Sequence, residues 1–190
     1  MIAPLRTATL GFLAIAAAAL VGCSPPIAAT APAGTGPLET LEERGIAVGG
    51  RPECEHNAYA ERCSWVSDED SPGGPSLVII DVTEYDEQDA AEEHFAWIGA
   101  GLFDNGCHFG ESFETSSYRA VAGTIGASPS MSLAPGETPV GGCALAIGDQ
   151  RTAMIIAQAT GSADVSFQST GADNPAAIAL AQVFDDGVPR

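Results

Sequence analysis

Two histidines next to cysteines are the residues of this sequence whose types and spacing could do chemistry. His56 follows Cys54 by two positions, and His108 comes directly after Cys107. If these two cysteines formed a disulfide, both imidazoles would lie near each other and near glutamates of the same segments. Imidazole and carboxylate groups are ligands of Zn²⁺ and Cu²⁺. A metal-binding protein or hydrolase that uses His56 and His108 is therefore the alternative hypothesis, although a disulfide consumes the thiolates that such metals prefer.

The sequence lacks the motifs of the common catalytic and metal sites. It contains no Gly-x-Ser-x-Gly, no His-Glu-x-x-His, no phosphate-binding glycine-rich loop and no EF-hand spacing. Lysine does not occur, and the third histidine, His94, is expected to be a partly buried polar residue on a helix. Catalysis near neutral pH needs a positioned base or nucleophile. We therefore expect a domain that binds without catalysing a reaction and that needs no cofactor or metal.

The N-terminus has the pattern of an export signal. Arg6 supplies a positive charge, and residues 7–22 are almost entirely apolar. At ~1.5 Å per helical residue this run is too short to span a ~30 Å hydrocarbon core comfortably, so residues 1–22 are predicted to be a signal peptide. The segment from Leu20 to Cys23 (LVGC) matches the lipobox of bacterial lipoproteins. The match implies cleavage before Cys23, lipidation of its thiol and anchoring at the extracytoplasmic face of the cell membrane.

The charge of the chain restricts its partners. Seven basic and 25 acidic side chains give a net charge of −18, and loss of Arg6 with the signal peptide takes the mature chain to −19. This charge repels nucleic acid and anionic lipid headgroups. We therefore expect contact with the membrane through the N-terminal lipid and no binding of nucleic acid. Cations, basic peptides and basic proteins remain possible partners.

The cysteines agree with export. Besides Cys23, the chain has Cys54, Cys63, Cys107 and Cys143. An even number of cysteines in an exported protein predicts two disulfides, because thiols oxidise outside the cytoplasm. Four cysteines allow three pairings, and their spacing does not choose among them.

The organisation of the mature chain follows from its composition. Residues 23–37 are rich in Pro, Ala and Gly, which predicts a lipidated Cys followed by an extended tether. Residues 38–190 are predicted to form a single domain, in which residues 40–44 make one helical turn capped by its first residue. Residues 63–67 and 77–83 are β-branched or aromatic and flank a loop of Asp, Pro and Gly, so they predict a hairpin.

A change in the spacing of apolar residues predicts the first long helix. Ala91, Phe95, Ile98 and Leu102 recur at helical spacing, so residues 86–102 are predicted to be a helix that ends at Asn105-Gly106. Further strands are predicted at residues 118–124, 131–133, 143–147, 152–159 and 163–168.

The last helix begins where Asn174 caps and Pro175 opens it, and it is predicted to continue to Phe184. Runs of strands with segregated helices favour an α+β domain. We expect an antiparallel sheet of about five strands with the two main helices packed on one face and two disulfides.

At this point the chain resembles a group of small actinobacterial secreted lipoproteins of the Cys-x-Trp type, a domain family of unknown function. The shared features are the lipobox, the tether, Cys63-Ser64-Trp65 at the start of the first strand, a later strand beginning at Cys143, and an Ala-rich final helix. The resemblance implies the fold and the location but no activity. The family often has a cysteine in the last helix, and this chain has none there.

The resemblance also implies a disulfide pairing. It joins Cys63 to Cys143 and leaves Cys54 with Cys107. The alternative is the local pairing, in which Cys54 bonds Cys63 and Cys107 bonds Cys143.

These observations predict a non-catalytic binding or scaffolding domain. The lipid and the tether would present it to an envelope protein or a small ligand. The expected binding surface is the sheet face left uncovered by helices or the groove beside the helix that bears His94 and Trp97.

Overall fold

The structure is a computed structural model that describes residues 37–49, 51–67, 76–125, 139–160 and 171–189. The predicted signal peptide, the predicted lipidation site Cys23 and the predicted tether up to residue 36 lie outside the described residues. The strands predicted at residues 131–133 and 163–168 lie outside them as well.

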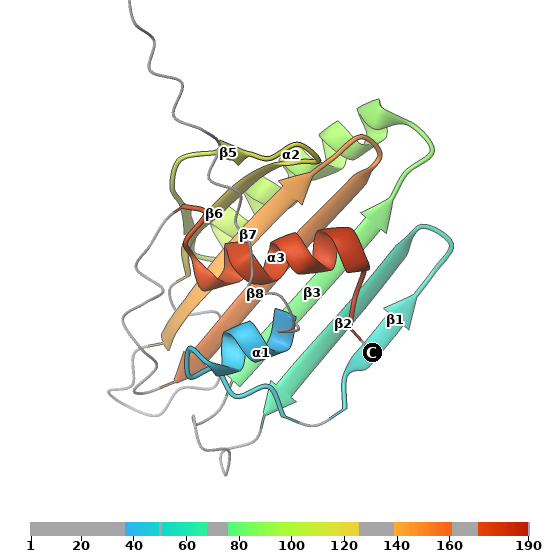
Figure 1. Cartoon of the computed structure of the whole chain (residues 1–190). Helices are drawn as coiled ribbons and strands as arrows, with labels where there is room; N and C mark the ends of the chain where they lie inside the picture. The colour runs from blue at the N-terminus through green and yellow to red at the C-terminus, as the bar shows by residue number, and fades with distance from the viewer. Residues whose placement is uncertain (1–36, 50, 68–75, 126–138, 161–170, 190) are drawn as a thin grey trace, which may run out of the picture.

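An antiparallel sheet organises the domain (Figure 1). In chain order its eight strands are β1 (Glu53–His56), β2 (Ala60–Ser67), β3 (Ser76–Glu84), β4 (Cys107–Phe109), β5 (Phe113–Glu114), β6 (Arg119–Ile125), β7 (Pro139–Ile147) and β8 (Arg151–Thr160). Their order across the sheet is β1-β2-β3-β8-β7-β6-β4, and β5 pairs with β6.

The α+β class with an antiparallel sheet is confirmed, and the prediction of about five strands is wrong. The unpredicted strands β1, β4 and β5 are four, three and two residues long. Such short segments produce no recognisable alternation, and β1 is charged and exposed on both sides. The hairpin of β2 and β3 and the hairpin of β7 and β8 form as predicted.

The three helices lie on both faces of the sheet. They are α1 (Pro37–Glu42), α2 (Gln88–Asp104) and α3 (Pro175–Asp186). Figure 1 shows α1 and α3 in front of the sheet and α2 behind it. The expectation that both main helices share one face is therefore wrong.

Alternation along the central strands explains the two covered faces. In β7, Ala144 and Ala146 belong to the hydrophobic cluster beneath α3, whereas Cys143 and Leu145 belong to the cluster beneath α2. Successive side chains of a strand point to opposite faces, so a strand that is apolar at every position buries both. The central strands therefore need a helix on each side.

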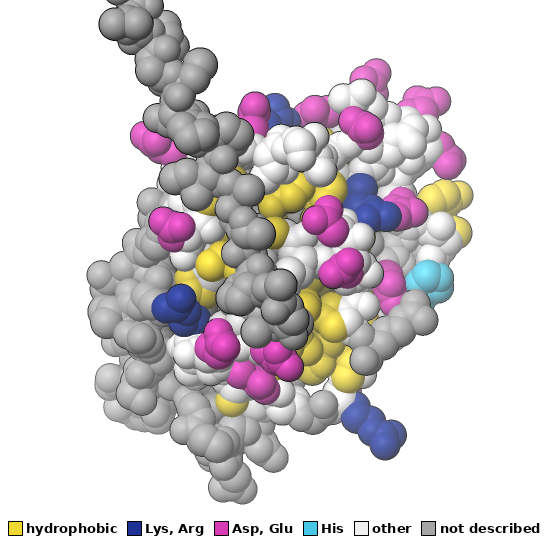
Figure 2. Space-filling view, in the orientation of Figure 1, with side chains coloured by type: hydrophobic (Ala, Val, Ile, Leu, Met, Phe, Trp, Pro, Cys, Tyr) yellow, Lys and Arg dark blue, Asp and Glu magenta, His cyan; other side chains and the backbone are white. Residues whose placement is uncertain are grey.

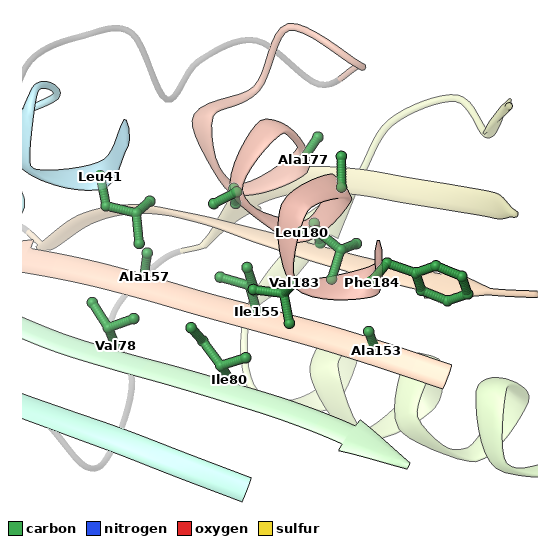
Figure 3. Close-up of a cluster of buried hydrophobic side chains, with 14 of the residues drawn as sticks. Leu41, Val78, Ile80, Ala153, Ile155, Ala157, Ala177, Leu180, Val183 and Phe184 are labelled. Carbon is green, nitrogen blue, oxygen red and sulfur yellow. The ribbon is translucent and has the colours of Figure 1, made fainter. Parts of the chain in front are cut away.

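Buried apolar side chains join α3 to the sheet. Leu180 and Val183 of α3 lie over Ile155 and Ala157 of β8, and all four are fully buried (Figure 3). Burial of one Leu, Ile or Val side chain stabilises a fold by about 1.5–3 kcal/mol. This cluster is the main core, and α2 covers a smaller one that includes Leu145.

The helix ends follow local sequence chemistry. The side chain of Asn174 accepts a hydrogen bond from the amide of Ala176 at 2.8 Å, with Pro175 in the first turn, so the predicted cap of α3 is confirmed. Helix α2 ends before Gly106, whose φ of 89° favours glycine. Helix α1 differs from its prediction: it begins at Pro37, and the predicted cap Thr40 is buried inside it.

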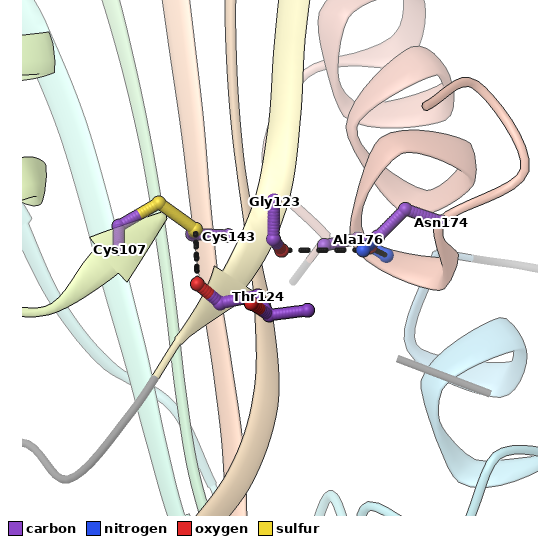
Figure 4. Close-up of a disulfide and its surroundings, with 6 residues drawn as sticks. All are labelled: Cys107, Gly123, Thr124, Cys143, Asn174 and Ala176. Carbon is purple, nitrogen blue, oxygen red and sulfur yellow. Dashed lines mark hydrogen bonds between the residues drawn. A yellow bond between two sulfur atoms is a disulfide. The ribbon is translucent and has the colours of Figure 1, made fainter. Parts of the chain in front are cut away.

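The two disulfides follow the local pairing. Cys54 bonds Cys63, and Cys107 bonds Cys143 (Figure 4). The pairing implied by the resemblance, Cys63 with Cys143 and Cys54 with Cys107, is therefore wrong.

Sheet geometry explains the correction. Cys54 lies directly opposite Cys63 on the neighbouring strand, with 4.1 Å between their Cα atoms. Cys63 faces the α3 core whereas Cys143 faces the α2 core, so the sheet itself separates these two thiols. Cys54 and Cys107 lie in β1 and β4, which are the first and last strands of the sheet order.

Candidate functional site

The two cysteine-adjacent histidines lie far apart. His56 is in β1 and His108 is in β4, at opposite ends of the sheet order. Five strands lie between β1 and β4, and neighbouring strands are ~4.8 Å apart. A metal ion shared by His56 and His108 is incompatible with this placement. Within the residues that the structure describes, no group of three or more His, Cys, Asp or Glu side chains is arranged to hold a metal ion.

Each of these histidines is exposed to solvent. His56 lies across from Glu61 in the β1–β2 ladder. The ring of His108 meets the ring of Phe103 edge-on, with 6.3 Å between their centroids. The two imidazoles therefore have different neighbours and share no site.

A groove lies instead between α2 and the part of the sheet that α2 leaves uncovered. Its volume is about 380 Å³, within the range of ligand pockets. Helix α2 packs against β4, β7 and β8, and β2 and β3 extend the sheet past it. Most of the floor is apolar: Leu77 and Ile79 of β3 lie beside Met154 and Ile156 of β8, and Gln158 of β8 also lines the groove.

The wall of the groove comes from one face of α2. Trp97, Ile98 and Leu102 supply its apolar part. Gly101 belongs to the same wall, and a Cβ built on it would meet no atom within 4 Å. The helix therefore leaves open space where another residue would fill the groove.

Register sets the polar end of the groove. Arg62, Asp81 and Met154 lie side by side on β2, β3 and β8, because each is the cross-strand partner of the next. Arg62 and Asp81 therefore share the face of the groove floor, and both line it. Thr83 Oγ1 donates a hydrogen bond to Asp81 Oδ1 at 3.1 Å.

An aromatic cluster forms the rim at this end. The rings of His94 and Trp97 stack at a centroid distance of 5.5 Å and an angle of 16°. His94 Nδ1 and the Tyr85 hydroxyl share a hydrogen bond, and Thr152 Oγ1 lies 3.4 Å from the same nitrogen. This cluster fixes the orientation of the His94 ring.

Burial lowers the pKa of His94 below its ordinary value of 6.5, and the nearby Asp81 carboxylate opposes this effect without cancelling it. Burial likewise raises the pKa of Tyr85. At neutral pH both rings are therefore uncharged.

Trp97 is exposed although it is a large aromatic residue. Its side chain is 70% exposed, whereas Trp65 in the α3 core is 4% exposed. One face of the indole lies against His94, and the rest is open to solvent. Exposed aromatic rings beside a groove are typical of binding sites.

Sequence reasoning singled out His94 and Trp97 but missed Arg62, Asp81 and Gly101. Side chains alternate between the two faces of a strand, so Leu77, Ile79 and Asp81 lie on the same face. This alternation could have placed Asp81 beside the apolar floor. The contribution of Arg62 depends on strand register, which the sequence alone does not supply.

Comparison with known proteins identifies no relative. No protein-family model, curated protein or solved structure matches the chain. The resemblance to Cys-x-Trp lipoproteins therefore stays a prediction. None of the described helices combines the length and the apolarity needed to span a bilayer.

Proposed function

We propose that the protein is a cell-envelope lipoprotein whose domain binds a ligand in the groove beside α2 and catalyses no reaction. The lipid on Cys23 would hold it at the extracytoplasmic face of the cell membrane, and the tether would lift the domain from the surface. Two disulfides support an oxidising location.

The observation that carries the binding role is the groove itself. It joins an apolar floor to a few convergent polar groups, Arg62, Asp81 and His94, and an exposed indole stands at its rim. This combination is the usual composition of a small-molecule site. The His94 imidazole, the one titratable base of the cluster that could work near neutral pH, is already engaged by Tyr85 and Thr152. Binding without turnover is the simplest use of such a site.

The test blocks the groove without disturbing the core. Gly101→Phe would place a ring in the open space beside Leu102. Gly171→Phe is the control: its Cβ position also has no atom within 4 Å, and Gly171 lies outside the groove. The full-length lipoprotein and both variants are purified from envelopes in neutral detergent and examined by native mass spectrometry.

We expect a small-molecule adduct on the wild type and on Gly171→Phe, and its loss from Gly101→Phe. An adduct that persists equally on Gly101→Phe would place the binding site elsewhere.

A further inference from the structure

The polar end of the groove indicates the charge of its ligand, if the groove is the binding site proposed above. The Asp81 carboxylate borders the apolar floor and accepts a hydrogen bond from the neutral hydroxyl of Thr83. A carboxylate beside an apolar surface favours a positively charged group.

Arg62 does not neutralise this end. It lies between two carboxylates in one row of the sheet, with Glu55 opposite it on β1 and Asp81 opposite it on β3. Among the described residues, Arg62 forms no ion pair with either of them within 4.0 Å. Glu55 lies outside the groove, but its position beside Arg62 gives the row of one guanidinium and two carboxylates a net negative charge.

The neighbouring groups do not add positive charge. His94 is neutral near pH 7, because its burial disfavours the imidazolium. The chain as a whole carries −18, and Figure 2 shows acidic side chains outnumbering basic ones on the α1 and α3 face. The net negative charge of the chain would therefore repel an anionic ligand at long range. At short range such a ligand would meet a single arginine, Arg62, which lies between two carboxylates.

Trp97 completes the site. Its ring is 70% exposed and stacks on His94, and the Asp81 carboxylate lies close enough to His94 to act on its charge. The face of an indole attracts a cation through its quadrupole, and tryptophan is the strongest aromatic partner for this interaction.

We propose that the groove binds a hydrophobic organic cation. Its apolar chain or ring lies on the floor of Leu77, Ile79 and Ile156, and its positive charge lies between the Asp81 carboxylate and the ring of Trp97. The chemical class is an amine or a quaternary ammonium attached to a short apolar body, since the volume of about 380 Å³ suits a small ligand.

The experiment compares three probes with the same six-carbon chain and different head groups: hexyltrimethylammonium, hexanoate and hexanol. Each is titrated calorimetrically into the full-length lipoprotein in nanodiscs of neutral phosphatidylcholine, with empty nanodiscs as the blank. We expect the cation to bind about tenfold more tightly than hexanol, and hexanoate to bind more weakly than either.

Matched variants separate local contacts from net charge. Asp81→Asn and Asp89→Asn change the net charge equally, but Asp89 lies at the start of α2 outside the groove. Trp97→Leu and Phe103→Leu each remove an exposed aromatic ring from α2, and Phe103 does not line the groove. We expect Asp81→Asn and Trp97→Leu each to weaken cation binding by about fivefold or more, and the controls to leave it within about twofold.

The outcomes distinguish this inference from the proposed function. Equal affinity for the cation and hexanol, both lost in Gly101→Phe, would overturn the cation and leave the groove as a binding site. Binding of no probe, or binding that Gly101→Phe leaves intact, would overturn both. If Asp89→Asn reduces the preference for the cation as much as Asp81→Asn does, the preference arises from net charge. That result would overturn the local site.

Discussion

The imidazole of His94 stacks on the indole of Trp97 with an interplanar angle of 16°, while its Nδ1 shares a hydrogen bond with the Tyr85 hydroxyl. The ring is thus held by two aromatic neighbours on one side of the groove. Its protonation would place a charge in a partly buried site, which links the stability of the domain to pH.

Folding stability is expected to fall as pH decreases through the titration of His94. The pKa of His94 is lowered in the folded state, mainly by burial, from an ordinary value of 6.5. The unfolded chain therefore takes up the proton at higher pH than the folded domain. The contribution is fully present above pH 6.5 and is lost as the pH falls from there to the folded pKa.

Urea unfolding between pH 7.5 and pH 5 measures this effect, when the wild type is compared with His94→Gln. The variant should show a smaller loss of stability over this range. His56→Gln is the control, because His56 is exposed on β1. An equal dependence of the unfolding free energy on pH in the wild type and His94→Gln would contradict the prediction.

The two disulfides should contribute unequally. Cys107 and Cys143 are 36 residues apart in the sequence, whereas Cys54 and Cys63 are nine apart. Loop-closure entropy then predicts a loss of about 4 kcal/mol for replacing the first pair with alanine and about 2.5 kcal/mol for replacing the second. Chemical denaturation of the two double variants provides the comparison, and the reverse order would show that native-state contacts outweigh loop entropy.

Gly123 should tolerate no side chain. A Cβ on Gly123 would lie 2.1 Å from the carbonyl oxygen of His108, so β4 would have to move away from β6. We expect Gly123→Ala to lower the free energy of unfolding by at least about 2 kcal/mol. Gly171→Ala has open space around the new methyl group and serves as the control. Similar stabilities for the two variants would show that β4 yields easily.

Lipidation is expected to depend on Cys23, because only its thiol can accept the diacylglyceryl group. Cys23→Ala should abolish lipid incorporation and cleavage before residue 23. Metabolic labelling with a radioactive fatty acid and N-terminal sequencing report these two events. Normal processing of the variant would refute the lipobox assignment and favour an uncleaved membrane anchor.

Local chemistry predicted the elements that carry strong local signals. Asn174 caps α3, and the spacing of Ile98 and Leu102 placed the buried side of α2. Short edge strands such as β1 have no such signal, because Glu53 and Glu55 are exposed. They form by pairing with β2, which is a long-range interaction.

The side on which each helix packs could not be predicted. Strands β7 and β8 are apolar at successive positions, so their sequence is compatible with a helix on either face. Which helix covers which face depends on the connections between elements. The candidate site shows the same limit: His94 and Trp97 are three residues apart on one helix, whereas Arg62 and Asp81 meet only through strand register.

The positions of the disulfides have a mechanical consequence for the edges of the sheet. One bridge fastens β1 to its neighbour β2, and the other fastens β4 to β7 across β6. Both outer strands are therefore covalently locked, and neither can peel away to exchange with the same strand of an adjacent molecule. If the domain is presented at the envelope surface as proposed, where no ATP-driven chaperone would reverse such an exchange, both edges of the sheet resist it.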